Sequence, residues 1–177
     1  MRQTFFLLLL ALGFFQDTAY PQESREYWLK AAFIYNFAKF VEWPADVFKN
    51  ESSPINLVVL GTDPFGTALD TIREKNIKGR KLVIRRISRI ENLEECHLLF
   101  VCASERGQLR TILNSIKNQS ILTISDMEKF APLGGIIGLI TVEDKIQFEI
   151  NLEAAQRQRL KISSELLKLA RNMRSGG

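Results

Sequence analysis

The feature that most constrains this chain is an aromatic, apolar stretch between residues 27 and 44. Apolar side chains recur there at helical spacing, at Tyr27, Ala31, Ile34, Ala38 and Val41. Further aromatic residues widen this stripe until little polar surface remains, and such a helix must be buried on most of its faces. Ser24 is a candidate N-cap, and Pro44 cannot continue a helix. We therefore expect one aromatic helix that lies across a β-sheet and is held at its end by Trp43.

Most aromatic side chains of this helix are expected to belong to the core. The alternative is that a few polar-tipped residues line a pocket or a contact surface, because Tyr and Trp combine an apolar body with a polar group. The residues concerned are Tyr35, Asn36 and Trp43.

The start of the chain is predicted to be an export signal. Arg2 precedes an apolar run over residues 5–15, which is typical of a secretory signal peptide and short for a membrane span. We assign residues 1–20 to this signal and residues 21–177 to a single domain, which is long enough to bury a sizeable core. No clear cleavage site follows, so an uncleaved anchor is the alternative.

Apolar runs alternate with helical patterns in the middle of the chain. Buried strands are predicted at residues 55–60, 82–87, 97–102 and 121–124, and helices at residues 63–72 and 104–116. This alternation favours right-handed crossovers. We expect a mainly parallel sheet flanked by helices, a Rossmann-like three-layer α/β fold.

The last part of the chain has a different pattern. Residues 136–152 predict an antiparallel hairpin. Asn151 can cap a helix over residues 152–158, and Ser163 or the serine after it can cap another over residues 165–173.

Catalytic signals are few. His97 is the single histidine and follows Cys96, but adjacent residues on a strand point to opposite faces, so the two do not form a nucleophile and its base. No residues are spaced as metal ligands. Gly134 and Gly135 match no phosphate loop and favour a bend or close packing. We expect no catalysis, cofactor or metal, and a structural or ligand-contacting His97; an enzyme that uses Cys96 or His97 is the minor alternative.

The two cysteines are predicted to be unpaired. On one extended strand Cys96 and Cys102 would stand ~20 Å apart, at about 3.3 Å per residue. A disulfide needs Cα atoms within about 7 Å of each other. No disulfide is expected between them unless Cys96 lies in a loop that folds back, and a redox switch is the alternative to two buried thiols.

Residues 75–89 form a basic run in a chain whose net charge is +4. The run lacks the interleaved aromatic residues of nucleic-acid-binding modules, so no nucleic-acid partner is expected. A solvated surface is the simplest interpretation, and an acidic ligand or protein partner is the alternative.

The strand predicted at residues 146–152 carries polar side chains on one face, including Glu149 and Asn151. This face is either exposed to solvent or turned towards a cleft that Lys161 and Ser163 also border. Convergent polar groups in such a cleft, with His97 as a further contact, could bind a small polar molecule.

Several blocks of the sequence resemble the YfiR/HmsC family of exported bacterial proteins, in the order of that family and over most of the chain. The blocks are residues 35–44, 60–66, 96–100, 134–135, 148–152 and 160–167. The first and last blocks are the most specific.

The resemblance implies a regulator rather than an enzyme. Such proteins lie in the periplasm, and the best known restrain an inner-membrane diguanylate cyclase by binding its periplasmic sensor domain, which lowers cyclic di-GMP and biofilm formation. They are similar in being homodimers with redox-sensitive disulfides. Here only Cys96 matches the recurring Cys-His pair and Cys102 has no counterpart, so the resemblance supplies no disulfide between them.

We expect a partner to meet an apolar surface near Tyr35, Phe40 and Trp43, or the last helix, which carries Leu166. The alternative function is a periplasmic small-molecule sensor or accessory protein for a different receptor, such as a histidine kinase or a transporter. That function would use the polar cleft described above.

Overall fold

The structure is a computed structural model that describes residues 22–143 and 145–174. The predicted signal peptide, residues 1–20, lies outside the described residues. Within the described part of the chain, no helix has both the length and the hydropathy that a bilayer crossing requires.

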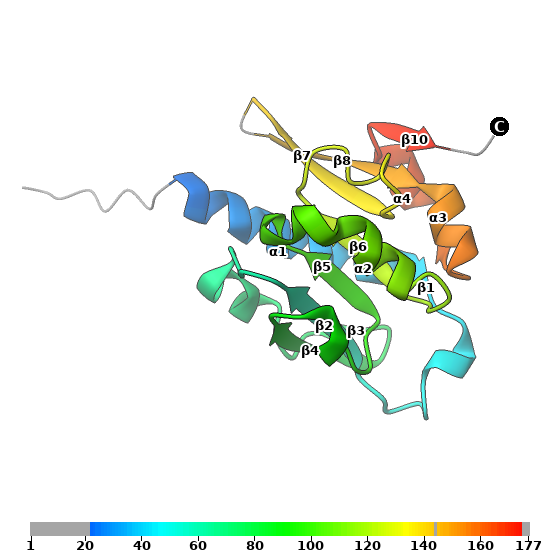
Figure 1. The fold of residues 1–177 in the computed structure, drawn as a ribbon. Helices are drawn as coiled ribbons and strands as arrows, with labels where there is room; N and C mark the ends of the chain where they lie inside the picture. The colour runs from blue at the N-terminus through cyan, green and yellow to red at the C-terminus, as the bar shows by residue number, and fades with distance from the viewer. Residues whose placement is uncertain (1–21, 144, 175–177) are drawn as a thin grey trace, which may run out of the picture.

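A mixed β-sheet forms the centre of the described structure, with eight strands in the order β10-β8-β7-β6-β5-β2-β4-β3 (Figure 1). The strands are β2 (Ile55–Leu60), β3 (Asn76–Ile77), β4 (Arg80–Ile87), β5 (Leu98–Val101), β6 (Leu122–Ser125), β7 (Ile137–Val142), β8 (Lys145–Asn151) and β10 (Asn172–Arg174). Strands β7, β6, β5, β2 and β4 are parallel neighbours. The predicted hairpin is present as β7 and β8, which pair antiparallel.

The mixed sheet corrects the expectation of a mainly parallel, Rossmann-like layout. Between β2 and β4 the chain forms a 3-10 helix, η2 (Gly66–Thr71), and then β3, which pairs antiparallel with β4. Asp63 does begin a turn there, since its Oδ1 accepts a hydrogen bond from Phe65 N (2.7 Å), but no α-helix follows. At the other side of the sheet β8 is antiparallel to β7 and parallel to β10. The prediction of an α/β fold is confirmed at the level of its class.

Helices cover both faces of the sheet. In Figure 1, α1 (Gln22–Phe40) lies behind the sheet and α2 (Leu109–Ser115) lies in front of it. On the α1 side, the rings of Phe37 and Phe148 pack 5.0 Å apart in the core. On the α2 side, Ile112 belongs to a second core. The other 3-10 helices are η1 (Ala45–Val47), η3 (Ile90–Asn92) and η4 (Ala103–Gln108).

The aromatic helix α1 begins before the predicted cap and ends at Phe40. The next two residues form β1 (Val41–Glu42), which pairs with β9 (Lys161–Ile162) in a separate antiparallel ribbon. Trp43 then donates a hydrogen bond from Nε1 to the carbonyl of His97 (3.2 Å). Trp43 therefore holds the end of this segment against the sheet, as expected.

Helix α3 (Leu152–Arg157) follows β8 directly. Its predicted cap is confirmed, because Asn151 Oδ1 accepts a hydrogen bond from Ala154 N (2.9 Å). Asn151 Nδ2 also donates to the carbonyl of Ala131 (2.9 Å). The side chain of Asn151 thus joins α3 to the loop before β7.

Helix α4 (Ser164–Leu169) is capped by Ser163, whose Oγ accepts a hydrogen bond from Leu166 N (3.2 Å). The prediction that this helix continues to residue 173 is wrong. Arg171 N donates to the carbonyl of Phe148 (2.9 Å), and the residues after it join the sheet beside β8. Pairing with the free edge of β8 replaces the last turn of the helix.

Gly135 lies at a close contact before β7. A Cβ at this position would come within 2.1 Å of the Phe130 ring, so no side chain fits. This contact agrees with the prediction that the glycine pair allows close packing.

Candidate functional site

The residues predicted to meet a partner are largely engaged inside the protein. Leu166 is buried in the core, and Phe40 packs half-buried against it. The hydroxyl of Tyr35 donates to the carbonyl of Asn76 (3.0 Å). Trp43 is half-buried and hydrogen-bonded, as described above. These side chains present only part of their surface to a partner, and Leu166 presents almost none.

Another set of apolar side chains is exposed on α1. Trp28 is 42% exposed and Leu29 is 47% exposed, and Ala32 on the next turn is also exposed. We call these three residues the α1 apolar surface. Leu169, at the end of α4, is exposed as well, and α4 contacts α1. The sequence pattern of α1 is apolar on nearly all sides, so it could not show which side the fold would leave uncovered.

A polar cleft of about 400 Å³ opens at the carboxyl end of β6, between α1 and the hairpin. Glu26 and Lys30 come from α1, Asp126 follows β6, Thr141 lies on β7 and Glu149 on β8. The ammonium group of Lys30 lies 2.6 Å from both the Glu26 and Asp126 carboxylates, and the Lys30 side chain is only 5% exposed.

Lys30, Glu26 and Asp126 satisfy one another in this cleft. The hydroxyl of Tyr27 donates to Asp126 (2.9 Å) and that of Thr141 donates to Glu26 (2.8 Å). Burial alone would raise the pKa of Glu26, but the hydrogen bonds from Lys30 and Thr141, with the charge of Lys30, hold it below its ordinary value. The cluster therefore acts as a closed network that ties α1 to the sheet.

The five residues predicted to bind a ligand do not converge on this cleft. Glu149 lines it. Asn151 and Ser163 use their side-chain oxygens as helix caps, and Lys161 is exposed on β9. His97 lies at the opposite edge of the sheet, where it lines a different cavity.

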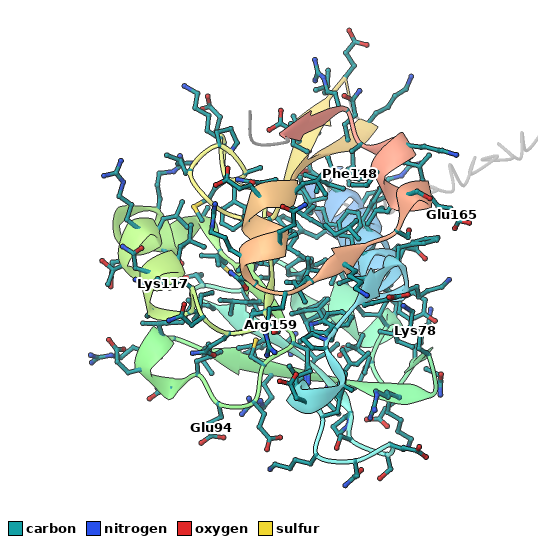
Figure 2. All side chains as sticks on the ribbon, turned by 90° about the vertical axis from the view of Figure 1, so that its right-hand side faces the viewer. Lys78, Glu94, Lys117, Phe148, Arg159 and Glu165 are labelled. Carbon is teal, nitrogen blue, oxygen red and sulfur yellow. The ribbon has the colours of Figure 1, made fainter. Side chains whose placement is uncertain are left out.

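This second cavity, of about 570 Å³, lies where β2, β5 and β6 begin, and we call it the amino-edge cavity. Three of its residues, Asn56, His97 and Ser120, are polar and more than nine-tenths buried. Its walls come from the segment between η1 and β2, from the segment before β6, and from Arg159 after α3. Arg159 lies near the centre of Figure 2.

His97 fastens the segment before β2 to the sheet. Its Nδ1 accepts a hydrogen bond from Asn56 N (3.0 Å), so the neutral ring carries its proton on Nε2. The ring stacks on Phe48, with centroids 4.7 Å apart and planes at 9°. Burial lowers the pKa of His97 by more than its hydrogen bond to the Val47 backbone raises it. His97 therefore contributes to the cavity mainly by shaping its floor.

The basic run also supports this part of the molecule. Arg80 Nη1 donates to three backbone carbonyls of the loop over residues 50–53, at 2.8 to 2.9 Å. Arg86 pairs with Asp63 at 2.5 Å. The segment predicted as a solvated surface thus carries arginines that fix neighbouring loops.

The sequence reasoning missed Asn56 and Ser120. Asn56 is the one polar residue in the apolar run of β2, which is a usable signal of a special environment. Ser120 follows a polar turn, where a serine is common, so its burial could not be predicted.

The match to a protein family covers most of the chain. The model of the family described as YfiR/HmsC-like matches residues 27–171. The chain belongs to the YfiR/HmsC-like family. This is a regulatory family that is not known to be enzymatic, and it suggests a periplasmic regulator of cyclic di-GMP signalling that interacts with a partner protein.

Two solved structures share the fold of this YfiR/HmsC-like protein. A conserved domain protein from Vibrio cholerae aligns with a TM-score of 0.53 and 11% identity over 84% of this chain and 60% of that one. The ABC domain in complex with L-Trp from Streptococcus pneumonia aligns with a TM-score of 0.51 and 10% identity over 68% of this chain and 55% of that one. The chain thus matches little more than half the length of either structure, and the likeness concerns the fold alone. A comparison with curated proteins gives no match.

The two cysteines of this YfiR/HmsC-like protein are free thiols at opposite ends of β5. Cys102 belongs to the core on the α1 side, whereas Cys96 packs against the core on the α2 side. Burial raises the pKa of each thiol to about 12. Both are therefore protonated at neutral pH and poor nucleophiles.

Proposed function

We propose that this YfiR/HmsC-like protein is exported to the periplasm and represses an inner-membrane diguanylate cyclase by binding its periplasmic sensor domain. The observation that supports this proposal is the family match over residues 27–171, because the family is linked to cyclic di-GMP signalling through a partner protein. Repression of the cyclase lowers cyclic di-GMP and biofilm formation. As the resemblance implies, the proposed functional form is a homodimer.

The α1 apolar surface is the proposed contact for the sensor domain. Exposed aromatic and aliphatic side chains that lie together on a helix favour protein contacts, and Trp is among the residues enriched at energetic centres of interfaces. Tyr35 and Phe40 lie further along the same helix and extend this contact. Trp43, which is half-buried and hydrogen-bonded, and Leu166, which is buried, offer less surface to this contact.

Repression by binding requires that the protein prefer one state of the sensor domain. A partner that binds the inactive state more tightly shifts the population towards that state. A tenfold preference corresponds to about 1.4 kcal/mol. Contact by a few apolar side chains can supply a difference of this size, since each fully buried Leu-sized side chain contributes roughly 1.5–3 kcal/mol.

The test uses two leucines of nearly equal exposure. Leu29, on α1, is 47% exposed, and Leu133, in the loop between β6 and β7, is 46% exposed. The tagged wild-type protein and the variants Leu29→Glu and Leu133→Glu are incubated with a detergent extract of the host's membranes, and diguanylate cyclase activity in the captured material is measured. We expect wild type and Leu133→Glu to capture the activity and Leu29→Glu to capture at least about tenfold less.

Two results contradict parts of this proposal. If the wild-type protein captures no cyclase activity, the proposed function is wrong. If Leu29→Glu captures as much activity as Leu133→Glu, the function stands but the α1 apolar surface is not the contact.

A second function, a small-molecule sensor for a different receptor, is favoured by one observation. The amino-edge cavity has the size of a ligand site and several buried polar groups. Capture of a histidine kinase or a transporter, in place of a cyclase, would support this second function.

A further inference from the structure

We propose that the amino-edge cavity binds a small, uncharged, hydroxylated molecule of monosaccharide size. This cavity lies apart from the α1 apolar surface. Binding of a small molecule in it can be measured on the purified protein, without the partner. The inference therefore goes beyond the proposed function, and the two can fail separately.

The first argument is that a buried hydroxyl group in this cavity lacks a hydrogen-bond partner. Among the described residues, the hydroxyl of Ser120 is buried and has no hydrogen-bond partner. The side chain of Asn56, which is 6% exposed, lies beside it as a second polar group. Both residues line the cavity. Buried polar groups without partners are rare in native proteins and destabilise them. A ligand that both donates and accepts hydrogen bonds would remove this cost.

The second argument is that the buried part of the cavity is uncharged. Asn56 and Ser120 are uncharged side chains. The His97 ring is neutral because its Nδ1 accepts a hydrogen bond from Asn56 N and so carries no proton. A buried ion needs an opposite charge as well as hydrogen bonds, and this floor offers none. Uncharged hydroxyl groups match an amide and a hydroxyl better than a carboxylate or phosphate does.

The third argument is that the charges at the rim are already paired. Lys49 forms an ion pair with Glu95. Arg159 pairs with Asp46 at 2.9 Å. An uncharged ligand leaves both of these exposed pairs intact.

The fourth argument concerns size and the remaining walls. A volume of about 570 Å³ lies within the range of small-molecule sites and exceeds what one sugar ring requires. Val47, Pro54 and Ile121 provide apolar surface for the C–H faces of a ring, and Asn118 and Gln119 provide further amides. In the polar cleft at the carboxyl end of β6, by contrast, Lys30 and its two carboxylate partners satisfy one another.

The test is a titration of the ¹⁵N-labelled mature protein with D-glucose, D-galactose and N-acetyl-D-glucosamine, with glycine and inorganic phosphate as charged probes. We expect at least one sugar to shift the amide resonances of residues that line the cavity, at concentrations up to about 10 mM. Glycine and phosphate should leave these resonances unchanged.

The variant Asn56→Leu separates a ligand site from a structural residue. Its affinity for the sugar should fall at least tenfold. Because Ser120→Ala removes a buried hydroxyl without a partner, this second variant should melt about 2–4 °C higher than wild type when ligand-free, and it should also bind the sugar more weakly. The matched control is Asn36→Leu on the exposed side of α1, which should bind the sugar like wild type.

Three results would overturn the inference. One is the absence of any sugar-induced shift at the cavity. Another is binding of glycine or phosphate that depends on Asn56. The last is a lower melting temperature of Ser120→Ala together with unchanged sugar affinity, since that result would make Ser120 a structural residue.

Discussion

His97 shows how a single side chain can hold an irregular segment against a sheet. Its Nδ1 accepts from Asn56 N, its ring stacks on Phe48, and its carbonyl accepts from Trp43. The two contacts of the ring, the hydrogen bond from Asn56 N and the stacking on Phe48, suit the neutral imidazole. Protonation would place a second donor opposite the Asn56 N–H and charge a buried group.

The stability of the protein should therefore depend on pH near neutrality. The folded-state pKa of His97 lies below its ordinary value of 6.5, so the unfolded chain binds the proton more readily between these two pKa values. The stabilisation is complete above pH 6.5 and is lost as the pH falls from there through the folded-state pKa. The loss amounts to about 1.4 kcal/mol for each unit by which the pKa is displaced. Urea unfolding between pH 5 and 8 measures this loss of stability.

The variant His97→Gln is the comparison for this prediction. Glutamine can accept the hydrogen bond from Asn56 N but does not titrate. The groups that influence the His97 charge, Glu95 and Arg80, remain in place. The pH dependence between about 5 and 7 should be smaller in the variant than in wild type. Equal slopes in the two proteins would show that His97 is not its source.

Among the elements, α1 contacts several parts of the chain that are distant in sequence, including η2, β3, β8 and α4. Its buried side joins the core beneath the sheet, and Lys30 joins its first half to Asp126 after β6. The Lys30 side chain is 5% exposed and that of Asp126 is 11% exposed, so water screens this pair little. The network therefore fixes the position of α1 over the carboxyl edge.

Replacing Lys30 by methionine should reduce the free energy of unfolding by about 3 kcal/mol, because Asp126 would stay buried without its cation. Arg157→Met in α3 is the matched control: Glu153 and Arg157 have the same spacing as Glu26 and Lys30 but are exposed. That variant should change stability by no more than about 0.5 kcal/mol. Urea unfolding of both variants checks the prediction, and equal effects would contradict it.

The sequence predicted the type of most elements better than their ends. Apolar runs identified the buried strands, and the caps at Asn151 and Ser163 were predicted correctly, because both signals are local. The end of α4 was not predictable, since it depends on the pairing of Arg171 and the residues after it with β8. The same reason applies to η2, where the antiparallel strand β3 takes part of the crossover.

At the scale of the whole molecule, the sequence indicated the family but not the cavities. The amino-edge cavity combines β2, the start of β5, the segment before β6 and Arg159, which are far apart along the chain. No local pattern brings Asn56 and Ser120 together. The positions of Glu149 and Lys161 depend on distant pairing in the same way, because β9, which carries Lys161, pairs with β1 and not with the hairpin that carries Glu149.

The central claim, repression of a diguanylate cyclase, is tested most directly by intracellular cyclic di-GMP. The nucleotide is measured in the host after deletion of the gene, and again after restoration with wild type, with Leu133→Glu or with Leu29→Glu. The account predicts that cyclic di-GMP rises on deletion, returns to its original level with wild type and Leu133→Glu, and stays high with Leu29→Glu. An unchanged level on deletion would contradict it.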